Sequence, residues 1–144
     1  MNDTLAAIVC VVFVVLALWH LYMAMFGAPG GGGAVPSVNG KPLFVPSTQS
    51  TVAVGVALLL CALLVAATAG RVSVGLPRNV LVWLSCALAL GLLARAIGEF
   101  RYVGFFKKVR GSRFATLDTY VYSPLCLLLA AGVARVASKT YITA

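Results

Sequence analysis

Four long apolar stretches separated by polar connections set the pattern of this chain. They cover about residues 5–26, 48–69, 79–97 and 118–137, and their interiors consist mostly of aliphatic, small and aromatic residues. A helix needs about 20 apolar residues to cross a hydrocarbon core about 30 Å thick, and in lipid the backbone must satisfy its own hydrogen bonds. The pattern therefore predicts an all-α, integral membrane, antiparallel four-helix bundle that forms one domain over residues 1–144.

The composition supports the membrane class. Hydrophobic residues make up 62% of the chain and charged residues 10%, and the mean hydropathy is +1.04. A soluble domain carries charge at roughly a quarter of its positions. Only Asp3 is charged before the first stretch, so the basic segment of a signal peptide is missing and we expect a retained helix.

The three connections differ in character. Residues 27–47 contain a glycine run, four prolines and Asn39-Gly40, which favour turns and a flexible linker over a helix. Residues 70–78 form a short link. In residues 98–117 we expect a partly helical segment at the membrane interface, with its phenylalanines facing lipid or the bundle. We expect its basic side chains to point to lipid head groups, namely Arg101, Lys107, Lys108, Arg110 and Arg113.

The connectivity places the strongly polar residues of the spans at one end of the bundle. With four spans, the first and third connections share one side of the membrane, and both termini lie on the other. A charge inside the hydrocarbon costs about 2.5 to 3.5 kcal/mol on insertion scales, so we predict at least one arginine–carboxylate pair. The candidate ligand-binding residues in and around this polar layer are His20, Tyr22, Arg95, Glu99, Arg101, Asp118 and Tyr122.

Several interpretations of this polar layer remain open. In one, Arg95 pairs with Glu99 or Asp118, Arg101 pairs with the other carboxylate, and the closed network holds helix ends together. In another, the layer is the polar head of a pocket for a lipophilic or anionic ligand. A proton or ion path is a third, for which two carboxylates and one histidine are few.

The four cysteines, one in each stretch, are interpreted as small packing residues. They are Cys10, Cys61, Cys86 and Cys126. A metal site needs several His, Cys or carboxylate ligands close together, and no such spacing occurs, so none is expected. The sequence assigns no cofactor.

Four segments spread over nearly the whole chain carry a resemblance. They are Trp19–Tyr22, Val35-Pro36 with Gly40-Lys41-Pro42-Leu43-Phe44 and Pro46 in the first connection, RAIGEFRYVGFFKK at residues 95–108, and Asp118-Thr119 with Tyr122-Ser123-Pro124-Leu125-Cys126. In these segments the chain resembles an uncharacterised family of small bacterial four-helix membrane proteins, domain-of-unknown-function family 3995. The resemblance implies a four-helix membrane bundle and brings no activity with it.

We therefore expect a multi-pass protein of a bacterial inner membrane that binds a lipophilic or anionic ligand, or a membrane partner, at the polar layer. One alternative is a small membrane enzyme acting on a lipid or quinone-like substrate, with Glu99 or Asp118 as acid/base and His20 assisting. Another is an accessory structural subunit of a membrane complex. The expected partners are membrane lipids and a second copy of the chain or a larger membrane complex, and no nucleic acid, because the basic loop between two spans is short.

The basic residues near the span ends favour one orientation. The first and third connections hold Lys41, Arg101, Lys107, Lys108, Arg110 and Arg113, and the opposite side holds Arg71, Arg78, Arg135 and Lys139. Because basic residues accumulate in cytoplasmic connections, this weak excess predicts a cytoplasmic third connection with both termini outside.

Overall fold

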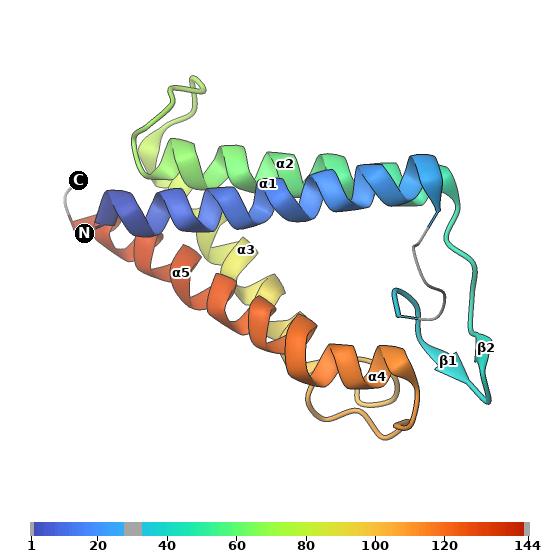
Figure 1. Cartoon of the computed structure of the whole chain (residues 1–144). Helices are drawn as coiled ribbons and strands as arrows, with labels where there is room; N and C mark the ends of the chain where they lie inside the picture. The colour runs from blue at the N-terminus through green and yellow to red at the C-terminus, as the bar shows by residue number, and fades with distance from the viewer. Residues whose placement is uncertain (1, 28–32, 143–144) are drawn as a thin grey trace.

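The computed structural model describes residues 2–27 and 33–142 (Figure 1). In chain order its elements are α1 (Asn2–Phe26), β1 (Ser37–Val38), β2 (Lys41–Pro42), α2 (Thr48–Thr68), α3 (Arg78–Ile97), α4 (Arg113–Leu117), the π-helix η1 (Asp118–Tyr122) and α5 (Ser123–Ile142). Four helices are long and apolar enough to cross a membrane, and the last of them, Arg113–Ile142, joins α4, η1 and α5. The predicted all-α fold with four spans is confirmed, and the chain is a multi-pass membrane protein.

The fourth span is longer than predicted at both ends. It begins at Arg113 instead of Asp118 because the side chain of Ser112 caps the helix, accepting a hydrogen bond from the N–H of Ala115 at 3.0 Å. It runs to Ile142 instead of residue 137. The first turn of this helix therefore belongs to what the pattern assigned to the third connection.

The fourth span widens to π geometry over η1, immediately before Pro124. The N–H of Ser123 bonds the carbonyl of Asp118, five residues earlier. A proline has no N–H to donate inside a helix, and a single wider turn is a common way for a helix to absorb a local irregularity. The span therefore passes Pro124 as one continuous helix, with Asp118 at the start of the widened turn.

The helices form two packed pairs, α1 with α2 and α3 with α5. At Gly55 of α2 the first pair is so close that a Cβ atom would lie 2.9 Å from the side chain of Leu21. The pairs meet at the end where α1 begins and α5 ends, and there Gly132 of α5 faces the side chain of Val9. Toward the first and third connections the two pairs diverge (Figure 1).

Buried hydroxyl groups join three helices at the end where the pairs meet. Thr68 Oγ1 lies 2.8 Å from Ser85 Oγ, and Thr140 Oγ1 donates to the carbonyl of Thr68 at 2.8 Å. All three residues are buried. This hydroxyl cluster links α2, α3 and α5, and it supplements an apolar core that includes Val65 and Val133.

The first connection forms a small hairpin that reaches the fourth span. β1 and β2 pair antiparallel, and Asn39 and Gly40 between them have φ of 51° and 75°, as a two-residue hairpin turn requires. The predicted turn is confirmed. Residues 28–32 of the glycine-rich part lie outside the described residues, so the linker interpretation stays a prediction. Tyr122 Oη donates to the carbonyl of Gly33 at 3.0 Å, which fastens the connection to η1.

Candidate functional site

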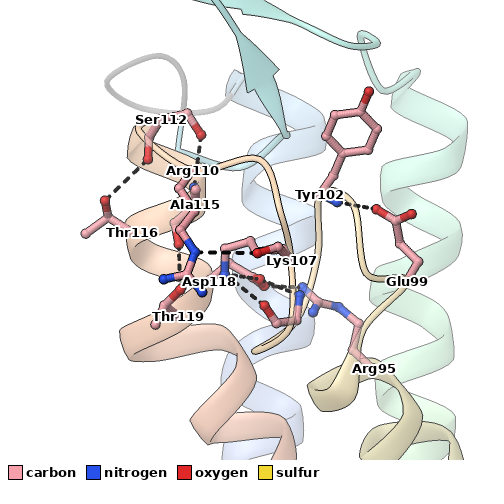
Figure 2. Close-up of polar contacts among 11 residues, drawn as sticks. Arg95, Glu99, Tyr102, Lys107, Arg110, Ser112, Ala115, Thr116, Asp118 and Thr119 are labelled. Carbon is pink, nitrogen blue, oxygen red and sulfur yellow. Dashed lines mark hydrogen bonds and ion pairs between the residues drawn. The ribbon is translucent and has the colours of Figure 1, made fainter.

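Asp118 is the centre of a charge cluster that it forms with Arg95 and Lys107, shown in Figure 2. Arg95 Nη2 lies 2.8 Å from Oδ1 of this fully buried carboxylate, and Lys107 Nζ lies 3.0 Å from Oδ2. The N–H of Gly104 also donates to Oδ2, at 2.7 Å. The predicted arginine–carboxylate pair is confirmed. Because a buried charge is tolerated only when it is paired and hydrogen-bonded, these three partners explain how Asp118 can lie in the interior.

Lys107 overturns the expectation that the basic residues of the third connection all point to head groups. Its side chain is 1% exposed. Besides the contact with Asp118, its ammonium donates to the carbonyl of Gly104 at 2.9 Å and to Thr119 Oγ1 at 2.6 Å. These contacts match the three donors of an ammonium group. The expectation was wrong for Lys107 because a buried acid within reach of the loop binds its charge more strongly than the interface does.

Two glycines give the third connection the path that brings Lys107 to Asp118. Gly98 and Gly104 have φ of 90° and 91°, a region that favours glycine. A Cβ atom on Gly104 would overlap the backbone of Ile97 and Gly98, so the loop closes on itself backbone to backbone. The N–H of Gly104 is thereby directed at Asp118. In the sequence, this closed loop is indicated only by two glycines six residues apart, Gly98 and Gly104.

Arg95 is the partly exposed member of the charge cluster. Its side chain is 37% exposed, and its Nη1 is buried without a hydrogen-bond partner. Arg95 also lies in the last turn of α3, where a positive charge interacts favourably with the helix dipole. Arg95 and Lys107 together face one carboxylate, so the charge cluster has two cations for one anion, and it confirms only the Arg95–Asp118 part of the closed-network interpretation.

Glu99 and Arg101 lie outside the charge cluster. Glu99 is exposed and accepts a hydrogen bond from the N–H of Tyr102, while the guanidinium of Arg101 lies 5.0 Å from the centre of the Tyr102 ring. The expected ion pair between Arg101 and the second carboxylate is wrong for the described residues. Because α3 ends at Ile97, Glu99 is no longer on the helical face of Arg95, and both loop residues find partners on Tyr102 instead.

His20 lies elsewhere, beside a cavity of about 590 Å³. The cavity lies between the end of α1, the beginning of α2 and residues 34–35 and 44–46 of the first connection, and it is open on one side. Its walls are mainly apolar, with Met23, Ala24, Val35, Phe44, Val45 and Val54 among them. Thr48, Ser50 and Thr51 add hydroxyl groups, and the described lining residues include no carboxylate and no lysine or arginine. The cavity is therefore an open, mainly apolar hollow with one imidazole among its described lining residues.

The ring of His20 makes one hydrogen bond within the protein. Nδ1 lies 2.7 Å from the carbonyl of Leu16, one helical turn earlier. A carbonyl oxygen can only accept, so Nδ1 carries the proton in this contact. No described residue bonds the other nitrogen, Nε2. In the neutral ring this nitrogen is a hydrogen-bond acceptor without a partner among the described residues.

The two candidate tyrosines serve other contacts. Tyr22 is exposed on α1, between the rings of Trp19 at 5.8 Å and Phe26 at 5.0 Å. Aromatic side chains of this kind near a helix end are typical of the membrane–water interface. Tyr122 packs against Phe114, whose ring centre is 6.0 Å away. Both therefore have clear structural contacts.

The structure divides the predicted site residues among separate places. Only Arg95 and Asp118 come into direct contact, while His20 lines the cavity and Glu99 and Arg101 stay in their loop. Lys107 and the N–H of Gly104 are the partners of Asp118 that the sequence pattern did not predict. The ligand-binding role of the predicted residues stays a prediction.

The thiols give no sign of a metal centre. Among residues 2–27 and 33–142, no group of three or more His, Cys, Asp or Glu lies together. The four cysteines are free and partly buried, and Cys10 Sγ donates to the carbonyl of Ala62 at 3.4 Å. This contact joins α1 to α2, in line with a packing role.

Comparison with known proteins identifies a family. Residues 13–133 match the sequence profile of the family described as "Protein of unknown function (DUF3995)". The match includes both His20 and the residues of the charge cluster. No curated protein and no solved structure matches the chain.

Proposed function

We propose that this chain, which belongs to the DUF3995 family, is a membrane protein that binds a lipophilic molecule in the cavity beside His20. The observation that carries the proposal is the cavity itself. Its volume of about 590 Å³ lies within the range of small-molecule sites, which are concave, mostly apolar and fitted with a few polar groups. The cavity has this combination between the end of α1 and the beginning of α2.

The walls of the cavity favour an apolar occupant. The first connection contributes Phe44 and Val45, two exposed apolar side chains. Contact with an apolar ligand removes such surface from water, at about 25 cal/mol for each Å². Met23, with its flexible thioether, adapts to ligands of different shape.

The charge cluster is the poorer candidate for a binding site. The carboxylate of Asp118 already has three partners, which supports a structural role in holding the third connection on the fourth span. The enzymatic alternative needs a carboxylate beside His20. Neither Glu99 nor Asp118 is among the described lining residues of the cavity, so the binding function has the stronger support.

Two tryptophan variants of α2 test the proposal. Val54 and Val56 are 45% and 47% exposed, but only Val54 lines the cavity. Purified full-length protein is incubated with dioctylglycerol, a small lipid with one hydroxyl group, and occupancy is measured by native mass spectrometry. We expect Val54→Trp to fill the cavity and lower occupancy at least ten-fold, and Val56→Trp to leave it unchanged. Equal occupancy in the two variants, or none in the wild type, would contradict the proposal.

A further inference from the structure

We infer that the ligand of this cavity is an uncharged lipophilic alcohol or phenol whose hydroxyl group donates a hydrogen bond to Nε2 of His20. The inference rests on the proposed function and names the chemical class of the ligand. It is carried by the hydrogen bond of His20, by the absence of charged groups among the described lining residues, and by the depth of the ring.

The hydrogen bond between His20 and Leu16 determines which group the ligand must bring. Because the carbonyl of Leu16 takes the Nδ1–H of His20, Nε2 of the neutral ring can only accept. A ligand that satisfies it must therefore bring a donor. Hydroxyl and phenol groups donate, whereas esters, ethers and ketones only accept. A lipophile with a free hydroxyl group is the simplest molecule that fills the mainly apolar cavity and satisfies this nitrogen.

The described lining of the cavity favours an uncharged ligand. The described lining residues offer no lysine or arginine to a phosphate or carboxylate head group. At the beginning of α2, where free N–H groups would attract an anion, the N–H of Ser50 is already bonded to Oγ of Ser47 at 3.1 Å. Burying an unpaired charge costs far more than burying a hydroxyl group that has a partner. An uncharged head group is therefore favoured.

The position of His20 along α1 limits the size of the ligand's head group. His20 precedes the end of α1 at Phe26 by about six residues, or roughly 9 Å at 1.5 Å per residue. A hydroxyl group bonded to His20 therefore lies below the end of the helix. Only a small head group reaches that level while its hydrocarbon part stays among the apolar walls. Bulky phospholipid head groups fit this position poorly.

A matched pair of ligands tests the inference. Dioctylglycerol and its methyl ether have the same chains and nearly the same volume, but only the alcohol can donate a hydrogen bond. We expect the full-length wild type to bind the alcohol at least ten-fold more tightly. His20→Leu should bring the two affinities within about two-fold of each other, a change on the scale of one hydrogen bond. Met25→Leu, at an exposed position of α1 that is not among the described lining residues, is the control and should keep the ten-fold preference.

A spectroscopic measurement on the unmutated protein covers the case in which His20→Leu fails to fold. In protein labelled with ¹⁵N-histidine, the alcohol should shift the Nε2 resonance of His20, and the methyl ether should not. If alcohol and ether bind equally well and Val54→Trp removes both, the hydroxyl inference falls and the cavity function stands. If neither ligand binds the wild type, both fall.

Discussion

Lys107 and Lys108 are neighbours with the same chemistry and opposite surroundings. The ammonium of Lys107 is enclosed by the charge cluster, whereas Lys108 is exposed. Because the two side chains point in different directions from the loop, Lys107 is a buried structural charge and Lys108 is a surface charge. The difference can be measured, because removing a buried partner strands a charge and removing an exposed one does not.

Replacing each lysine by methionine should give unequal losses of stability. Lys107→Met leaves the buried Asp118 with one cation fewer and should lower the free energy of unfolding by about 3 kcal/mol. Lys108→Met should change it by less than about 0.5 kcal/mol. Thermal unfolding in detergent, followed by circular dichroism, measures both. Adding Asp118→Asn to Lys107→Met should restore part of the loss, and equal effects of the two single variants would rule out the buried pair as a source of stability.

Two glycines offer a second comparison at the residue scale. Gly104 and Gly111 have nearly the same φ, 91° and 92°, but a Cβ atom meets backbone only at Gly104. Alanine at Gly111 should cost on the order of 1–2 kcal/mol for its backbone conformation alone. Gly104→Ala should cost clearly more, because the loop must open and its N–H moves away from Asp118. Thermal midpoints of the two variants decide the matter, and similar values would mean that the closed loop adds nothing.

At the scale of elements, the hydrophobic pattern predicts helices well and connections poorly. The three first spans end close to their predicted positions because the thickness of the bilayer fixes their apolar length. Residues 113–117 were assigned to a connection because their helix is set by the Ser112 cap, and a cap leaves no hydrophobic signal. The burial of Lys107 depends on a loop path in three dimensions, and no one-dimensional pattern distinguishes it from Lys108.

The packing of α1 against α2 should depend on one glycine. Gly55→Val places methyl groups where Leu21 now lies and should lower the thermal midpoint, because close-packed interfaces have little room to adjust. Gly91 of α3 has open space around it, so Gly91→Val is the matched control. Unfolding of both variants in the same detergent gives the comparison. A loss at Gly91 as large as that at Gly55 would show that helix propensity, and not packing, is responsible.

At the scale of the whole molecule, the antiparallel order of the spans follows from their number, but their pairing does not. The apolar faces of the four helices are too alike in sequence to show that α1 packs with α2 and α3 with α5. The divergence of the two pairs toward the first and third connections was likewise beyond the pattern (Figure 1). This divergence is why His20 and Asp118, expected in one polar layer, belong to different surroundings.

The orientation in the membrane remains a prediction from the basic residues, six beside the first and third connections against four on the opposite side. We expect both termini outside. Alkaline phosphatase fused after Ala144 should then be active, and green fluorescent protein at the same position should be dark. The reverse pair of readings would place the termini in the cytoplasm and the cavity on the outer face.

The hydroxyl cluster of Thr68, Ser85 and Thr140 holds the two helix pairs together where they converge. A helix of about 20 residues is a lever arm of roughly 30 Å. If one helix pair tilted by about 5° at the hydroxyl cluster, the opposite end of that pair would move by roughly 2.6 Å, close to the width of a water molecule. Tyr122 joins the fourth span to the carbonyl of Gly33, and the neighbouring Ala34 and Val35 line the cavity. Such a movement of the fourth span would therefore also move these lining residues. A change in how these three hydroxyl groups hold the helix pairs together at one end of the molecule would therefore change the width of the cavity at the other end.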